Sequence, residues 1–146
     1  MIVNFEKHPE QKEIKVLVTY TDMNGQVKKL QELISSVDKT IRCKGEDNDI
    51  WINASDIYYI ESVDKHTFIY CKKEVYAAEQ RLYQLAEELL KEGFVRVSKS
   101  CIININMLQS IRTIMNSRME ATLINGERIT VTRKFISEIR RKLEER

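Results

Sequence analysis

The stretch FVRVSKSCIIN, residues 94–104, places two apolar, β-branched runs on either side of a short polar segment. Phe94–Val97 and Cys101–Ile103 have the composition of strands. The residues between them, Ser98-Lys99-Ser100, are all polar and have the composition of a loop. The stretch therefore predicts two short strands separated by an exposed loop, in a fold built around β-structure.

Short strands of the same kind fill most of the chain beyond residue 40. The apolar run Ile57–Ile60 has no polar face, which predicts a strand covered on both sides. Asn125-Gly126 is the strongest hairpin signal in the chain, because both residue types tolerate the positive φ of a tight turn. Further strands are expected at Ile41–Lys44, Ile50–Ile52, Thr67–Cys71, Val75–Ala77, Ile111–Asn116, Glu120–Ile124 and Arg128–Thr132.

Two helices are expected among these strands. A stripe of leucines within residues 82–90 predicts the first, and Gly93 is placed to end it. The second is expected over about residues 134–143, where Phe135, Ile139 and Leu143 share one face. No repeat or flexible linker divides this region, so residues 41–146 are expected to form one mainly β domain.

Residues 1–40 are expected to form a strand-helix extension. The alternation in residues 14–20, IKVLVTY, predicts a strand, and Asn24 is a suitable N-cap for the helix that follows. The segment carries six Lys and six Asp or Glu, so it offers DNA no net attraction. We expect it to help assemble a dimer or, alternatively, to cover one end of its own β domain with the apolar helical face formed by Val27, Leu30, Leu33, Ile34 and Val37.

Composition excludes several classes of protein. Apolar residues make up 42% of the 146 residues, which is enough for a core and too much for a disordered chain. No window reaches the roughly 18 apolar residues of a membrane span, and the N-terminus lacks the apolar run of a signal peptide. The cytoplasm is therefore the expected location.

The cysteines and histidines do not form a recognisable chemical site. Cys43, Cys71 and Cys101 are far apart, and His8 and His66 do not lie at metal-ligand spacing. We interpret the three cysteines as small buried hydrophobes and expect no metal or other cofactor. His66 and Cys101 are the only pair to suggest a base and a nucleophile. Alternation would turn Cys101 inward with Ile103, so we expect neither catalysis nor a small-molecule substrate.

Basic residues concentrate toward the C-terminus and in predicted loops. Residues 94–146 carry 11 Lys or Arg against 5 Asp or Glu, whereas residues 1–93 carry 13 against 17. This asymmetry suggests a surface for a polyanion, although basic residues also simply solvate a surface. Three basic sites fall between strands or at strand ends, where binding residues concentrate: Lys65-His66, Ser98-Lys99-Ser100 and Arg133-Lys134.

Three stretches, in order, resemble the motifs of one known family, the LytTR DNA-binding domains. Residues 55–62, SDIYYIES, resemble the opening motif of the family. Residues 94–104 resemble its central signature, and residues 125–135, NGERITVTRKF, resemble its closing hairpin and helix start. Together the three motifs, at family-like separations, cover about residues 41–146.

The resemblance implies both a fold and a way of binding. The fold is mainly β, with LytTR-type antiparallel sheets and short helices, and the function is bacterial transcription regulation. Loops, not a recognition helix, would enter successive major grooves of double-stranded DNA. If residues 1–40 assemble a homodimer, as expected above, the DNA that it binds would carry paired repeats. The base-contacting positions of the family correspond to the Lys65-His66 loop, Lys99 and Arg133. Arg96, Ser98, Ser100 and Lys134 lie in the same motifs, and Arg96 either supports its loop or contacts phosphate.

The chain also departs from many members of the family. About 40 residues precede the LytTR-like part, which is too few for a receiver domain, so Asp22 is not interpreted as a phosphorylation site. The resemblance is to free-standing members, some of which are thought to be controlled by a partner membrane protein. The alternative function is a non-catalytic protein-interaction or sequestration module that retains the same fold.

Overall fold

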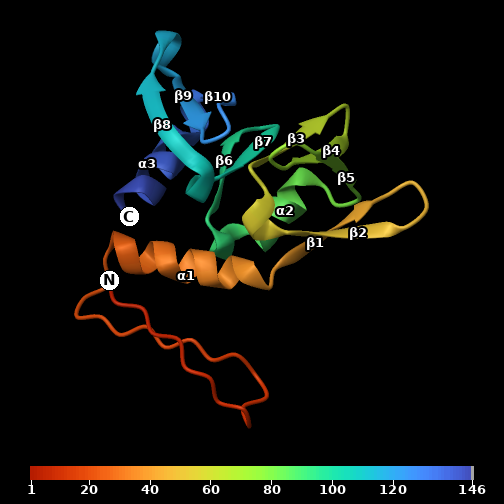
Figure 1. Cartoon of the computed structure of the whole chain (residues 1–146). Helices are drawn as coiled ribbons and strands as arrows, with labels where there is room; N and C mark the ends of the chain where they lie inside the picture. The colour runs from red at the N-terminus through yellow and green to blue at the C-terminus, as the bar shows by residue number, and fades with distance from the viewer. Residues whose placement is uncertain (146) are drawn as a thin grey trace.

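The computed structural model describes residues 1–145, and its strands form two antiparallel sheets (Figure 1). The larger sheet has seven strands in the order β2-β1-β5-β4-β3-β7-β6, and the smaller has the order β10-β9-β8. The strands of the larger sheet are β1 (Thr40–Lys44), β2 (Asp49–Asn53), β3 (Tyr59–Val63), β4 (His66–Tyr70), β5 (Val75–Ala78), β6 (Phe94–Ser98) and β7 (Cys101–Asn104). Those of the smaller sheet are β8 (Leu108–Thr113), β9 (Met119–Leu123) and β10 (Arg128–Val131). The expected mainly β fold of antiparallel sheets with short helices is confirmed.

Strands β6 and β7 divide the core into two parts because their side chains alternate between two faces. Phe94 and Ile102 pack on one side with helix α2 (Leu82–Glu88), against the inner face of the seven-stranded sheet. Val97 and Ile103 pack on the other side with the three-stranded sheet and helix α3 (Ile136–Glu144). Strand β7 is therefore buried on both faces, which explains its uninterrupted apolar run.

Most of the expected turns form where the sequence places them. The Asn125-Gly126 turn joins β9 to β10, with Gly126 at φ +88. Gly93 adopts φ +89 after the 3-10 turn η2 (Leu90–Glu92), as expected for the end of that helical segment. Two strands differ in their limits. β3 runs from Tyr59 to Val63, whereas the strand was expected at Ile57–Ile60. β8 begins at Leu108 and ends at Thr113, because Asn116 and Ser117 take the left-handed conformation, with φ 62 and 58.

Helix α1 (Gly25–Val37) forms as expected and is attached to the β domain. Its N-cap is Asn24, whose Oδ1 accepts a hydrogen bond from the N–H of Val27 at 3.0 Å. Lys142 of α3 pairs with Glu32 of α1 at 2.9 Å, and both side chains are mostly buried. On the other side, the Ser35 hydroxyl donates to Glu92 at 3.3 Å, and Lys39, just beyond the helix, pairs with Glu88 at 2.9 Å.

The expected strand at residues 14–20 is wrong. These residues are in no strand, and Ile14 and Leu17 are 95% and 88% exposed. A strand requires a partner for its backbone N–H and C=O groups, and no other described strand lies beside this segment. Residues 1–24, which we call the N-terminal arm, instead extend away from the domain on the far side of α1 (Figure 1).

The helices within residues 1–145 are all too short or too polar to cross a membrane. The longest of them, α1, has 13 residues.

Candidate nucleic-acid interface

The β6–β7 turn presents Ser98, Lys99 and Ser100, and Arg96 holds its backbone in place. The Arg96 guanidinium donates to the carbonyl oxygens of Ser98 at 3.1 Å and Lys99 at 2.6 Å. The Ser98 hydroxyl also accepts from the N–H of Ser100 at 3.2 Å. Arg96 therefore supports the turn, whereas the Lys99 side chain is exposed.

The β3–β4 turn lies beside the β6–β7 turn. Val63 and His66 pair across it, and Asp64 and Lys65 adopt positive φ values of 50 and 68, as a tight two-residue hairpin requires. Lys65 and His66 are exposed. The N–H of Ser62 donates to the carbonyl of Ser100 at 2.8 Å, which fixes this hairpin against the neighbouring turn.

The third predicted site, the junction between β10 and α3, is attached to the same strand as the β6–β7 turn. The Thr132 N–H donates to the carbonyl of Val97 at 2.9 Å. Arg133 and Lys134 follow in the 3-10 turn η5 (Arg133–Phe135), and both are exposed. The guanidinium carbon of Arg96 lies 5.9 Å from the centre of the Phe135 ring, so Arg96 contacts both sites.

The structure thus links the three sites that the sequence suggested. The chain of contacts runs from Ser62 through Ser100 to Arg96, and from there to Phe135. These contacts lie at one end of the seven-stranded sheet, because β3 pairs with β7 and β7 pairs with β6. Each site presents its cationic side chains to solvent while backbone and aromatic groups hold it in position. Such an arrangement suits the binding of a large anionic surface.

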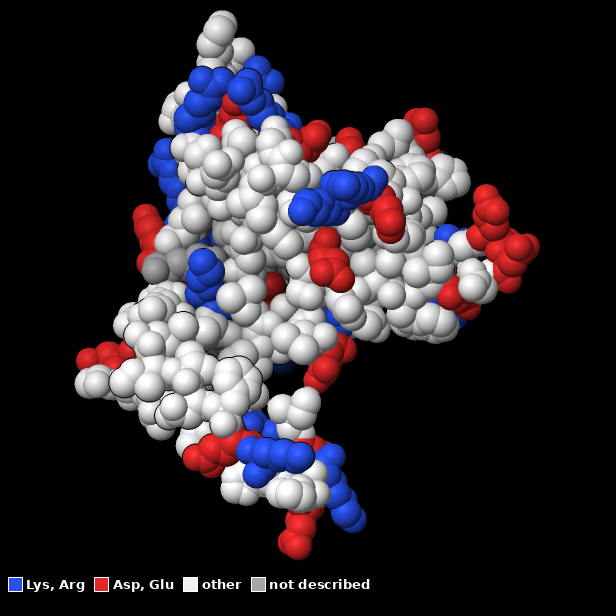
Figure 2. Space-filling view, viewed as in Figure 1, with Lys and Arg blue, Asp and Glu red and all other residues white. Residues whose placement is uncertain are grey.

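Sequence reasoning about loops did not identify the basic side chains of the smaller sheet and α3. Figure 2 shows Lys and Arg gathered over the end of the molecule formed by β8 and β9 and down the edge beside α3. The arginines that these elements carry are Arg112 of β8, Arg118 just before β9, Arg128 of β10, and Arg140 and Arg141 of α3. The excess of basic residues beyond residue 94 indicated them, but their common surface depends on how the sheet packs on α3.

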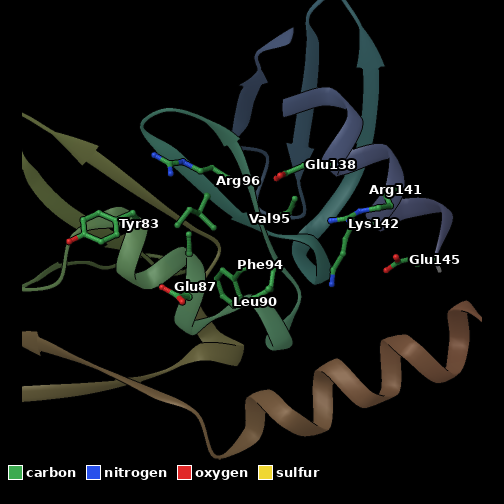
Figure 3. Close-up of a pocket in the computed structure, with 12 residues that line it drawn as sticks. Tyr83, Glu87, Leu90, Phe94, Val95, Arg96, Glu138, Arg141, Lys142 and Glu145 are labelled. Carbon is green, nitrogen blue, oxygen red and sulfur yellow. The ribbon is translucent and has the colours of Figure 1, made fainter. Parts of the chain in front are cut away.

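A cleft of about 560 Å³ lies between α2 and α3 (Figure 3). Phe94 and Val95 contribute to its wall, with the charged residues Glu87, Glu138 and Arg141 around them. Neither histidine nor cysteine is among its lining residues. Within residues 1–145, no three His, Cys, Asp or Glu side chains are grouped so that they would hold a metal ion.

The cysteines occupy apolar surroundings. Cys43 and Cys101 are buried, as expected, and Cys71 is partly buried. Burial raises the pKa of Cys43 and of Cys71 to about 11, with Asp56 a smaller cause for Cys71. Burial also raises the pKa of Cys101 to about 12, with a smaller effect of Glu61. A thiol with such a pKa is almost entirely protonated near neutral pH, which makes it a poor nucleophile.

Comparison with known proteins identifies the β domain. A family profile described as "LytTr DNA-binding domain" matches residues 47–144. A solved LytTr DNA-binding domain from Bacillus cereus superposes with a TM-score of 0.66 at 29% identity, covering 73% of this chain and 97% of that one.

Two curated relatives differ in how much of their length is matched. The sensory transduction protein LytT of Enterococcus faecalis is 26% identical over 72% of this chain, but the match spans only 43% of LytT. An uncharacterized HTH-type transcriptional regulator of Staphylococcus aureus is 26% identical over 83% of both chains. With the family profile covering most of its length and the fold in agreement, the chain belongs to the LytTr DNA-binding domain family.

Proposed function

We propose that this protein regulates bacterial transcription by binding double-stranded DNA in a sequence-specific way, without catalysis. The observation that carries the proposal is the chain of contacts that holds three exposed basic loops together in a LytTr domain. Because the proposed ligand is bacterial chromosomal DNA, we place the protein in the cytoplasm.

Loops, and not a helix, are the elements that we propose enter the major grooves. Helix α1 is fixed to the domain by the Glu32–Lys142 pair, and α2 has only seven residues, with Leu82 and Leu85 buried. No two α-helices follow each other directly in residues 1–145, as a helix-turn-helix would require. The turns that carry Lys65, Lys99 and Arg133 are exposed, so these side chains are accessible to DNA.

The proposed roles follow from the chemistry of each side chain. The planar guanidinium of Arg133 suits the paired acceptors of a guanine edge. Lys65, His66 and Lys99 suit single acceptors on bases or phosphates, and the hydroxyls of Ser98 and Ser100 and the ammonium of Lys134 suit phosphate oxygens. Arg96 positions the turn with two of its five N–H donors, and the other donors suit a phosphate oxygen.

Selection from a random duplex pool tests this function directly. We expect the full chain to enrich a short motif, and its affinity to fall steeply as salt concentration rises, because phosphate contacts release counterions. Failure to enrich any motif would contradict sequence-specific binding. Tight binding to a protein partner with no binding to DNA would favour an interaction or sequestration module instead.

We further propose that residues 1–40 join two copies of the chain into a homodimer on paired repeats. The N-terminal arm exposes large apolar side chains, including Ile2, Phe5, Ile14 and Leu17, each at least 88% exposed. Helix α1 extends this apolar surface with Leu33 and Val37, which are 38% and 63% exposed. An identical partner covers such a surface symmetrically, and covering it removes apolar area from water.

Deleting the arm alone tests the dimer, because the α1 contacts with the domain are left intact. A chain beginning at Met23 keeps the Asn24 cap and the pairs of Glu32 and Lys39. We expect this chain to sediment as a monomer and to lose the advantage of duplexes whose half-sites lie about 10–10.5 base pairs, or a multiple, apart. Retention of both properties would assign the arm another role.

A further inference from the structure

We propose that the outer face of α3 and the β8–β9 turn form a separate site for the phosphate backbone of duplex DNA, beyond the base-reading loops. We call it the α3 saddle and define it by Ser117, Arg133, Ser137, Arg140 and Arg141. The inference rests on the proposed DNA binding and deepens it by assigning a phosphate-binding surface that adds affinity without sequence preference.

The α3 saddle is a shallow hollow of about 620 Å³, made by two parts of the chain that are distant in sequence. Ser117 comes from the β8–β9 turn, where the left-handed backbone at Asn116 and Ser117 reverses the chain. Arg133 lies at the end of β10, and Ser137, Arg140 and Arg141 lie on α3. Ile136 and Glu144 complete the lining.

Charge in the α3 saddle strongly favours an anion. Three guanidinium groups and one carboxylate, that of Glu144, line the α3 saddle, and Arg141 also borders the neighbouring cleft with Glu138 and Glu145. Nearby cations are already paired, Arg112 with Glu120 at 3.0 Å and Lys142 with Glu32 at 2.9 Å. Among residues 1–145, no ion pair within 4 Å joins Arg133, Arg140 or Arg141 to a carboxylate. The three guanidiniums therefore keep their donors for an external ligand.

The start of α3 adds to this potential. No side chain caps its N-terminus, and the N–H of Ile136 already donates to the carbonyl of Arg133 in the preceding 3-10 turn. The positive end of the helix dipole lies at the same point, and anions are stabilised there. The helix thus contributes partial positive charge to a surface that its arginines already make basic.

Continuity with the base-reading sites identifies duplex DNA as the ligand. Arg133 belongs both to the β10–α3 junction and to the α3 saddle. A DNA groove that contacts Arg133 therefore places the sugar-phosphate backbone at its edge alongside α3. The seven residues from Arg133 to Arg140 span about 10 Å along a helix, which is about three base-pair steps of one DNA strand. A shallow, extended surface also suits a long polyanion better than a small molecule, which pockets usually enclose.

The test compares two double variants that each remove two adjacent positive charges. Arg140→Gln/Arg141→Gln changes the α3 saddle and leaves Arg133 in place. Lys72→Gln/Lys73→Gln is the control, because both lysines are exposed in the β4–β5 turn, at the opposite end of β4 from the β3–β4 turn. Binding is measured by fluorescence anisotropy from 50 to 200 mM salt, on the duplex enriched by selection and on a random duplex.

We expect the α3 saddle variant to bind both duplexes more weakly by the same factor. The loss of two phosphate contacts makes the slope of log affinity against log salt shallower by about 1.8. Raising the salt from 50 to 200 mM should therefore weaken binding by the wild type by about tenfold more than binding by the variant. The control should match the wild type. Arg140→Lys/Arg141→Lys should restore most of the binding, since a phosphate contact needs a cation more than a planar fork.

Several results would overturn the proposal. An unchanged salt slope, or a change equal to that of the control, would show that DNA phosphate does not bind the α3 saddle. A loss confined to the preferred duplex would show base recognition instead. Normal DNA binding with lost binding to polyglutamate would assign the surface to an acidic protein partner. If the wild type fails to bind DNA at any salt, the proposed function fails as well, which distinguishes that outcome from the others.

Discussion

Residues 14–20 and residues 101–104 are both short, β-branched runs, yet only the second forms a strand. Strand β7 pairs with β3 on one side and β6 on the other, and all four of its residues are buried. The arm segment has the same kind of side chains, but no strand within residues 1–145 pairs with it. A segment therefore forms a strand only where a neighbouring strand pairs with its backbone, and the composition of the segment does not show whether that neighbour exists.

The largest expected contrast between the arm and the β domain is in the free energy of unfolding. Leu89→Ala removes a completely buried side chain and should cost about 2–5 kcal/mol in the free energy of unfolding. Leu17→Ala makes the same change at a side chain that is 88% exposed, and should stay within about 0.5 kcal/mol. Urea unfolding at low protein concentration, where a dimer dissociates, measures both.

Equal costs for the two leucine variants at low concentration would contradict the comparison. They would mean that the arm packs on its own domain in solution. A loss for Leu17→Ala that appears only at high concentration would instead support a contact between two copies.

The next effect concerns DNA binding by the β domain. Arg133→Ala should cost about 1–3 kcal/mol on the preferred duplex and relax base preference at one position. Leu17→Ala should leave the affinity for a single half-site unchanged, because the arm carries three Lys against four Asp or Glu and lies away from the loops. Repeating the selection with each variant measures both. An equal loss for Arg133→Ala on preferred and random duplexes would make it a phosphate contact only.

A smaller effect on the free energy of unfolding tests whether α1 is packed on the β domain or is loosely attached like the arm. Lys142→Gln breaks the pair with Glu32, whose side chains are 19% and 12% exposed, and should cost about 1–2 kcal/mol of stability. Lys44→Gln is the matched control, since its pair with Glu79 is 3.5 Å long and at least half exposed, and should cost less than about 0.5 kcal/mol. Equal costs in urea unfolding would mean that α1 is only loosely held.

The smallest effect is expected for DNA affinity when a buried thiol is removed. Cys43→Ala should bind the selected duplex as the wild type does, since β1 is at the other side of the sheet from β6. In the folded wild type, Cys43 should react slowly with iodoacetamide at pH 8, because burial raises its pKa to about 11. A Leu17→Cys thiol in the arm should react rapidly. Loss of a bound metal or of a redox response in Cys43→Ala would contradict a purely structural role.

The pattern of side chains predicted the β domain well because the signals for its turns and helix ends lie within a few residues of the structures that they determine. Hairpin signals such as Asn125-Gly126 and the helix signals at Asn24 and Gly93 act over a few residues, and each lies where expected. The same reasoning failed for residues 14–20, because nothing local tells whether a partner strand exists. The limits of β8 were also missed, since the left-handed turn at Asn116 and Ser117 contains no glycine.

Sequence could name the loop residues of the proposed interface but could not place them relative to one another. The proximity of the β3–β4 and β6–β7 turns depends on the pairing of β3 with β7, which lie about 40 residues apart in the chain. The support that Arg96 gives to its turn was one of two alternatives in the sequence, and it is visible only in the hydrogen bonds to Ser98 and Lys99. Arg140 and Arg141 were missed because they lie on a helix, away from any motif.

The hydrogen bond from Arg96 to Lys99 has a consequence for how such a protein changes its target. The domain uses only the main-chain oxygen of residue 99, which every amino acid has, and leaves the side chain in solvent. Replacing residue 99 therefore disturbs neither the turn nor the contact of Arg96 with Phe135. With Lys99 as one of the proposed base-reading residues, a gene duplicate could acquire a new operator through one codon at this position, with folding and the other two loops unaffected.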